Sequence, residues 1–115
     1  MKHKAILINV KERSISEVEV EDSVDEYNRL IGSDCYTCGP RLPNLDGVLV
    51  DDNGLLNIDN DTMFFTFGKY PQPLAGNGLI LGCSRSGETV NVKSKLEDIK
   101  KIIKFHTLSE VRTMF

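Results

Sequence analysis

The Asn-Gly pair at positions 53–54 is the strongest hairpin signal in the chain, because these two residues favour a tight turn between antiparallel strands. The pair lies between two short apolar segments, residues 47–50 and 55–58, which we expect to be strands. The chain opens on a similar pattern, in which residues 4–10 and 14–20 are rich in β-branched and aliphatic side chains and are joined by a short polar link. Short strands separated by turns predict an antiparallel sheet built from hairpins.

Two segments have the spacing of amphipathic helices. The first follows Ser23, which stands three residues before Glu26 as in a capping box, and it should end before Gly32. The second follows Ser94, which has the same spacing to Glu97. The expected core-facing side chains are Val24, Tyr27, Leu30 and Ile31 in the first helix, and Leu96, Ile99, Ile102 and Ile103 in the second. The sequence therefore predicts an α+β fold with one helix after the first hairpin and one near the C-terminus.

The remaining segments are read from their apolar runs and turn residues. In chain order we expect a strand at 34–38, a loop with two prolines at 39–44, an irregular segment at 60–76, a buried strand at 78–83, a turn at 84–87 and a returning strand at 88–92. The tail, residues 106–115, fits either a short helix or an extended arm.

Length, charge and cysteine content limit the class of protein. A chain of 115 residues fits one domain, here a single ligand-binding domain over 1–115. Its formal net charge of −3 argues against a DNA-binding protein, but a few local cations could still bind a small anion. We find no apolar segment typical of a signal peptide or membrane span. Three cysteines, an odd number, argue against a disulfide framework, and we expect a cytoplasmic protein.

Metal, redox and catalytic motifs are weak. Cys35 and Cys38 could bind zinc together with Cys83 and His106, but a second close pair of ligands is missing, and we expect no metal. A redox role would need the cysteines at a helix N-terminus, where a prolyl loop is predicted instead. His3 and His106 are the only candidate bases at neutral pH, and both lie near the ends of the chain. We therefore predict neither enzymatic activity nor a cofactor.

The glycines between Gly76 and Gly82 resemble a phosphate-binding loop only faintly, because they lead into a predicted strand and no helix follows them. They still allow a ligand to approach the backbone closely, and Asn77 could form hydrogen bonds with a base or a ribose.

Residues 64–78 are the best candidate for a binding segment. They combine aromatic rings, a lysine, an asparagine and several glycines and prolines, a set that suits a nucleotide-sized ligand. The alternative is that the rings fill the core. The candidate ligand-binding residues are Phe67, Tyr70, Asn77, Arg41, Arg85 and Lys93, and the three cations are included because each lies in or beside a loop.

Several motifs resemble those of a family of small phage and mobile-element proteins of unknown function. The resemblance rests on the opening hairpin, the helix ending at Gly32, the strand at residues 34–35 and the segments 50–55 and 74–82, and it extends to about Phe105. Within such phage proteins the chain is also similar to the first Thoeris anti-defence type.

This resemblance implies a function. Proteins of that type bind cyclic ADP-ribose isomers without cleaving them, so that they silence a host immune signal, and they assemble as dimers or larger oligomers. It implies that Phe67 and Asn77 contact the ligand, with Arg41 and Lys93 nearby. We therefore expect a phage-encoded sponge that forms a homo-oligomer and binds a cyclic ADP-ribose isomer, with cyclic oligonucleotides as the second candidate ligands. The alternative is a protein–protein inhibitor of a host restriction or nuclease system.

Overall fold

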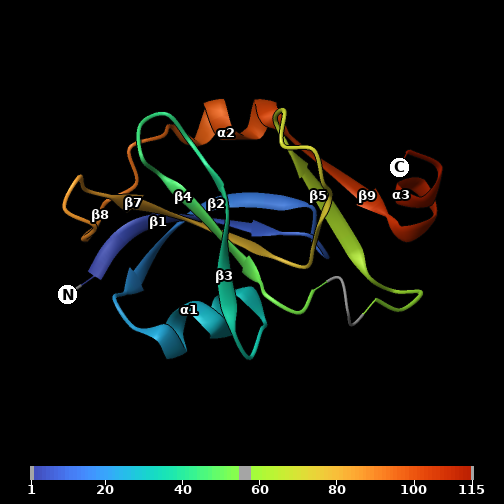
Figure 1. The fold of residues 1–115 in the computed structure, drawn as a ribbon, viewed down its shortest axis with the longest axis horizontal. Helices are drawn as coiled ribbons and strands as arrows, with labels where there is room; N and C mark the ends of the chain where they lie inside the picture. The colour runs from blue at the N-terminus through green and yellow to red at the C-terminus, as the bar shows by residue number, and fades with distance from the viewer. Residues whose placement is uncertain (1, 55–57, 115) are drawn as a thin grey trace.

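Within its described residues the chain forms two antiparallel β-sheets and three short helices, which confirms the predicted α+β class (Figure 1). The computed structural model describes residues 2–54 and 58–114. The larger sheet has the strand order β2 (Ser14–Glu21), β1 (Lys2–Asn9), β7 (Gly78–Cys83), β4 (Gly47–Asp51) and β3 (Tyr36–Arg41), and β8 (Thr89–Val90) pairs with β7. The smaller sheet has the order β6 (Leu74–Ala75), β5 (Met63–Phe67) and β9 (Ile103–Thr107). The helices are α1 (Val24–Ile31), α2 (Leu96–Ile102) and α3 (Leu108–Met114).

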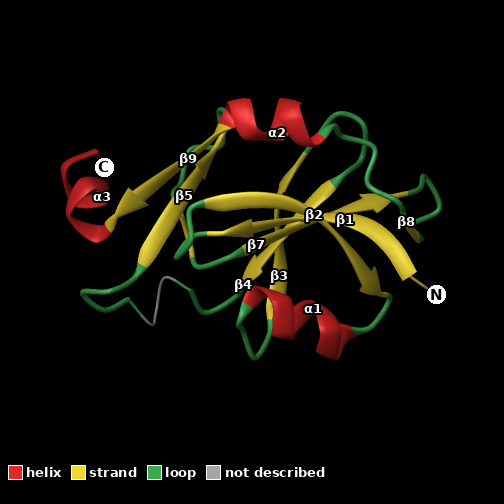
Figure 2. Cartoon of the chain, turned by 180° about the vertical axis from the view of Figure 1, so that it is seen from behind, coloured by secondary structure: helices red, strands yellow, loops and turns green. Residues whose placement is uncertain are grey.

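The two faces of the larger sheet carry separate cores. Alternate residues of a strand point to opposite faces, so Ile6 and Ile8 of β1 enter one core and Ala5 enters the other. The first core also contains Phe65 and Phe67 of β5 together with Ile80, Ile99 and Ile103, and the second contains Tyr27 and Ile31 of α1 together with Leu79. The larger sheet is therefore the middle layer of the molecule. Figure 1 shows α1 and α2 on its opposite sides, and Figure 2 shows from behind how β9 leads from α2 into the smaller sheet.

The opening hairpin and the first helix are confirmed. β1 and β2 pair antiparallel over their full length, from Lys2 opposite Glu21 to Asn9 opposite Ser14. Ser23 Oγ accepts a hydrogen bond from the Glu26 N–H at 3.3 Å, and Gly32 ends the helix in the left-handed conformation. The capping box is one-sided, because the Glu26 carboxylate pairs with Arg29. Val24, which we expected in the core stripe, is 59% exposed.

The prediction of a loop at 39–44 is wrong for its first half, because β3 continues to Arg41. The register between β3 and β4 shifts between Cys38 and Arg41. Pro40 lies within this shift, where its missing N–H costs no regular ladder bond, and β3 is an edge strand, which tolerates proline.

The segment 60–76 is also more regular than expected. Residues 63–67 form β5, which pairs with β6 on one side and β9 on the other. The aromatic run Met-Phe-Phe-Thr-Phe is thus a buried strand, in which Phe64 and Phe65 are fully buried. Aromatic side chains favour strands, so this run was a strand signal that the nearby prolines obscured.

The turn at Asn53 is present, but most of the strand expected to follow it lies outside the described residues. The Asn53 N–H donates to Asp51 Oδ1 at 3.0 Å, and the Gly54 N–H donates to the Asp51 carbonyl at 3.2 Å. Residues 55–57 of the expected strand lie outside the described residues, and Ile58 belongs to no strand. The strands that pair with β4 are β3 and β7, and neither belongs to the segment 55–58 that we expected to pair with it.

The strands and helices after β7 differ from the expectation in detail. The turn at 84–87 is confirmed, but the returning strand β8 contains only Thr89 and Val90. The prediction of a capping box at Ser94 is wrong, because Lys95 is the N-cap residue of α2 and its side chain forms no capping hydrogen bond. The tail contains both a strand and a helix: β9 includes His106, and α3 follows it. None of the helices within the described residues is long and apolar enough to cross a membrane.

Candidate functional site

A hollow of about 470 Å³ lies between the end of β3 and the turn that follows β5. Residues 39–43 form one wall of the hollow and residues 67–70 form another. Ile102, at the end of α2, completes the lining. Small-molecule sites typically have volumes of about 300–1,000 Å³, so the hollow has the size of such a site.

The wall after β5 is a sharp turn. Gly68 has a φ of 52°, in the left-handed region that glycine adopts without a Cβ clash. Its N–H donates to the Ile102 carbonyl at 2.8 Å, and the Tyr70 N–H donates to the Phe67 carbonyl at 2.9 Å. These bonds fix the backbone while the side chains of Lys69 and Tyr70 stay exposed to solvent.

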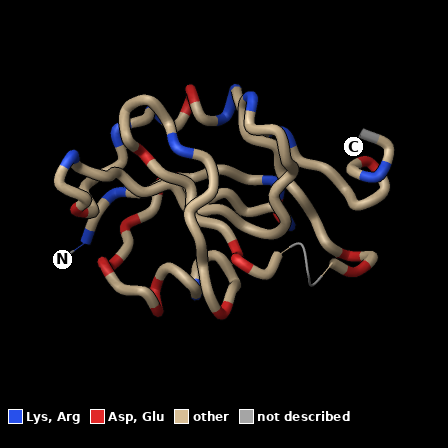
Figure 3. Tube along the Cα trace, in the orientation of Figure 1, with Lys and Arg blue, Asp and Glu red and all other residues tan. Residues whose placement is uncertain are grey.

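Two cations line the hollow, Arg41 from β3 and Lys69 from the turn. Both side chains are exposed, and neither has an ion-pair or hydrogen-bonding partner within residues 2–54 and 58–114. Figure 3 shows lysines and arginines gathered near α2 and the adjoining loops, whereas most acidic residues lie toward α1 and the link after β4. The hollow is therefore a locally positive region on a chain with a net charge of −3.

The hollow continues as a groove in both directions. Toward α2 it shares Leu42, Pro43 and Ile102 with a second hollow of about 400 Å³, which is also lined by Lys93, Lys95 and Asp98. On the other side it shares Gly39 and Tyr70 with a hollow of about 170 Å³. These three hollows, defined by their shared residues, are called the β3 groove below.

Asp46 fixes the loop between β3 and β4 that forms one wall of the groove. Its side chain is fully buried, and its carboxylate accepts hydrogen bonds from the Lys93 N–H at 3.0 Å and from the N–H and hydroxyl of Ser94 at 2.7 Å each. Asn44 adds a hydrogen bond from Nδ2 to Ser94 Oγ at 3.0 Å. Sequence analysis did not identify Asp46, because no local pattern shows that a loop aspartate will be buried against a distant loop.

The structure brings together three of the six predicted site residues, Arg41, Phe67 and Tyr70. Their roles differ, since Phe67 is only 3% exposed and packs in the first core, whereas Tyr70 is 37% exposed. Tyr70 is thus the ring that is available to stack on a ligand, and Phe67 supports the floor of the hollow. Lys69, which was not among the predicted residues, is the second free cation.

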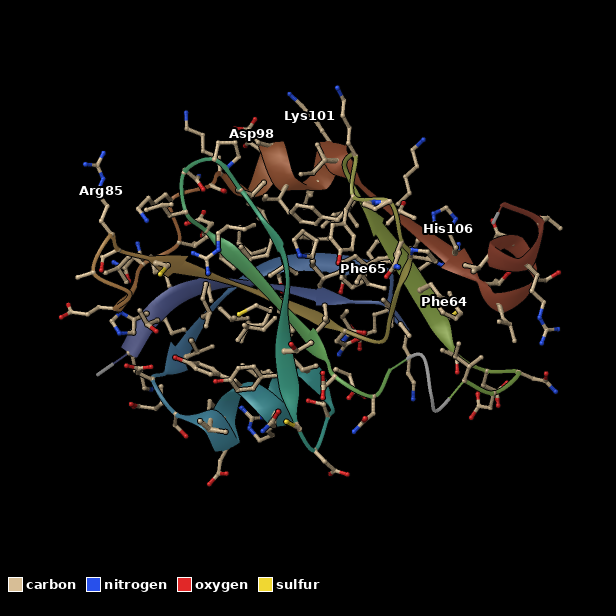
Figure 4. All side chains as sticks on the ribbon, in the orientation of Figure 1. Phe64, Phe65, Arg85, Asp98, Lys101 and His106 are labelled. Atoms are coloured by element: carbon tan, nitrogen blue, oxygen red, sulfur yellow. The ribbon has the colours of Figure 1, made fainter. Side chains whose placement is uncertain are left out.

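The other three predicted residues lie elsewhere or have structural partners. Asn77 Oδ1 accepts from the Val10 N–H at 3.0 Å and its Nδ2 donates to the Leu30 carbonyl at 3.4 Å, so this side chain links the opening hairpin to α1. Lys93 lines the part of the groove near α2, but its ammonium donates to the Cys83 carbonyl at 2.6 Å and lies 3.9 Å from Asp46. Arg85 points into solvent from the β7–β8 turn, at the end of the molecule opposite α3 (Figure 4).

Arg41 also lines a smaller hollow of about 210 Å³ together with Tyr27, Tyr36 and Cys83. Burial, and then the hydrogen bond that Tyr27 donates to Asp22 at 2.6 Å, raise the pKa of Tyr27 to about 12. This phenol is therefore protonated at neutral pH and has no basic character.

The cysteines do not form a metal cluster with other ligands. Cys35 and Cys38 are exposed, Cys83 is half-buried and all three are free thiols. His106 is buried, with Nε2 3.0 Å from Thr66 Oγ1. Within the part of the chain that the structure describes, no three His, Cys, Asp or Glu side chains are placed to hold a metal ion.

The fold and the groove together define an α+β domain with an open, locally cationic groove on its surface. The chain matched no family model, no curated protein and no solved structure.

Proposed function

We propose that the chain binds a small anionic ligand of the nucleotide class in the β3 groove and holds it without chemical conversion. The observation that carries the proposal is that the exposed Tyr70 ring and the free cations Arg41 and Lys69 line the same hollow of about 470 Å³. A phosphate or pyrophosphate would lie against the two cations, and a base or ribose would lie against the ring.

The chemistry of the hollow supports binding without turnover. The described residues that line the 470 Å³ hollow, where the phosphates would lie, include no histidine, cysteine, serine, aspartate or glutamate, and the cysteine, serine and aspartates of the groove line its other two hollows. Arginine and lysine at neutral pH donate hydrogen bonds and supply charge, but neither accepts a proton from a substrate. A site of this composition suits retention of an anion.

The resemblance to the first Thoeris anti-defence type suggests the biological setting of such binding. We propose a phage-encoded protein that acts in the host cytoplasm as a homo-oligomer and sequesters a cyclic nucleotide immune signal. Isomers of cyclic ADP-ribose are the first ligands to test, and cyclic oligonucleotides are the second.

The test is calorimetric titration of the purified protein with cyclic ADP-ribose isomers, cyclic di-AMP, cyclic di-GMP, ADP and GDP. A sequestering protein binds at least one of them and returns it intact after heat release and chromatography. Arg41→Gln and Lys69→Gln should each weaken binding about tenfold or more, because a hydrogen bond to a charged group contributes roughly 1.5–3 kcal/mol.

Arg85→Gln is the matched control, since it removes an exposed cation that lines none of the three hollows of the groove. Equal losses in all three variants would contradict binding in the groove. Recovery of a cleaved product would contradict sequestration. If none of these nucleotides binds, the proposal fails and inhibition of a host restriction or nuclease enzyme becomes the better hypothesis, with the acidic α1 side as the surface to mutate (Figure 3).

A further inference from the structure

The smallest hollow of the β3 groove differs chemically from its neighbour. Its volume of about 170 Å³ is below the roughly 300 Å³ of a typical site for a whole ligand, so it suits one part of a ligand. Its polar lining side chains are Thr37, Asp51, Asp52 and Gln72, and Tyr70 forms the boundary with the cationic hollow. The two adjoining hollows, which share Gly39 and Tyr70, thus differ in charge, since one is lined by two cations and the other by two carboxylates.

The two carboxylates have free hydrogen-bonding capacity. Asp51 Oδ1 accepts from the Asn53 N–H at 3.0 Å, which leaves Oδ2 available. Asp52 is exposed, and its carboxylate has no partner among the described residues. An ionised carboxylate only accepts hydrogen bonds, so this hollow favours a ligand edge that presents N–H donors.

We infer that the 170 Å³ hollow is a base-recognition subsite that prefers guanine over adenine; this inference rests on the proposed function of the groove. The Watson–Crick edge of guanine presents two adjacent donors, N1–H and the 2-amino group, which match the two oxygens of one carboxylate. Adenine presents its amino group beside the acceptor N1, which a carboxylate repels. The amide of Gln72 can donate to guanine O6.

The geometry orients the ligand. The base enters the acidic hollow beside Tyr70, and the phosphates lie in the adjoining hollow against Arg41 and Lys69. The carboxylates therefore determine which base binds, and the cations bind the phosphates. Base specificity and charge-driven affinity thus depend on different residues. Guanine-bearing cyclic nucleotides should bind ahead of those that carry only adenine, including cyclic ADP-ribose isomers.

The experiment compares GDP, IDP and ADP, which have the same phosphates and differ at the base edge. We expect GDP to bind at least tenfold more tightly than ADP, with IDP between them because hypoxanthine retains N1–H and lacks the 2-amino group. Asp52→Asn should weaken GDP binding several-fold and leave ADP binding unchanged. Asp34→Asn, at an exposed aspartate outside the groove, should change neither affinity.

The outcomes separate this inference from the proposed function. If ADP binds as tightly as GDP, or if Asp52→Asn weakens both equally, the inference is overturned while nucleotide binding stands. Arg41→Gln should weaken GDP and ADP by the same factor, since it acts on the phosphates. If GDP, ADP and the cyclic nucleotides all fail to bind, both the inference and the proposed function are overturned.

Discussion

Asp46 and Ser94 are 48 positions apart in the sequence and share two hydrogen bonds of 2.7 Å, from the N–H and the hydroxyl of Ser94 to the same carboxylate oxygen. The carboxylate is fully buried. The pair fastens the β3–β4 loop to the segment that leads into α2, so the groove wall and the helix beside it are held as one unit.

Asp46→Ala should lower the free energy of unfolding by about 3 kcal/mol, because it leaves three partly buried donors without their acceptor and each hydrogen bond to a charged group contributes roughly 1.5–3 kcal/mol. The corresponding fall in melting temperature is about 10 °C for a domain of this size. Thermal unfolding followed by circular dichroism measures it. Asp34→Asn serves as the control, and a similar loss in that variant would refute the role assigned to Asp46.

Phe67 and Tyr70 should respond in opposite ways to truncation. Phe67→Ala removes a buried ring from the first core and should cost about 3–5 kcal/mol of stability through the cavity it leaves. Tyr70→Ala should leave stability nearly unchanged and weaken nucleotide binding by about 1–3 kcal/mol, the usual contribution of stacking between a base and an aromatic side chain. Calorimetric binding beside thermal unfolding tests both, and unchanged nucleotide affinity in Tyr70→Ala would remove Tyr70 from the site.

Asn77→Ala should act on stability and spare the groove. The Asn77 side chain accepts a hydrogen bond from the Val10 N–H and donates one to the Leu30 carbonyl. Loss of these bonds should lower the free energy of unfolding by about 1–2 kcal/mol. Denaturant unfolding should show a lower midpoint with an unchanged slope. A variant that kept its stability but lost nucleotide binding would instead support the contact implied by the phage-protein resemblance.

Tyr27 should make the stability depend on alkaline pH. Its pKa is raised from 10.0 in the unfolded chain to about 12 in the fold, so folding favours the protonated phenol. The contribution of Tyr27 is fully present below pH 10 and is lost as the pH rises from about 10 to about 12. Unfolding by urea at pH 8, 10 and 11.5 should show a steeper loss in the wild-type protein than in Tyr27→Phe, and identical slopes would contradict this assignment.

Light scattering addresses the oligomeric state. A domain this small gains stability when it buries apolar surface between subunits, which is the physical basis of the predicted homo-oligomer. A mass of at least twice the monomer is expected at micromolar concentration, and a clean monomer mass would reject the prediction.

Local sequence signals were most reliable where no distant residue competes for the same atoms. The pairing of β1 with β2 and the ends of α1 follow directly from alternation and from Ser23 and Gly32. The same capping spacing failed at Ser94, because the buried carboxylate of Asp46 takes both the hydroxyl and the N–H. A reciprocal capping box does exist at Thr107 and Glu110, with hydrogen bonds of 3.1 and 3.2 Å, in the tail whose sequence fits either a helix or an extended arm.

The groove was only partly predictable for a related reason. Arg41 and Tyr70 are each recognisable from the sequence as side chains able to bind a ligand. Their proximity, in contrast, depends on the packing of the smaller sheet beside β3. Phe67 satisfied the same chemical criterion, but the alternation of β5 turns it inward. Local composition therefore identified side chains able to bind, whereas strand register decided which of them face the groove.

The central position of β7 has a consequence for folding. β7 joins β1 to β4, yet it begins at Gly78, after both of those strands and their hairpin partners β2 and β3. As the chain emerges from a ribosome, the hairpins β1–β2 and β3–β4 can form first. The edges of β1 and β4 that later pair with β7 then stay unpaired until β7 is made. Contacts that join distant parts of a chain slow folding, and unpaired edges promote aggregation, so folding should be late and cooperative. The interval before β7 is synthesised is when the edges of β1 and β4 that β7 later covers are open to pairing with other chains.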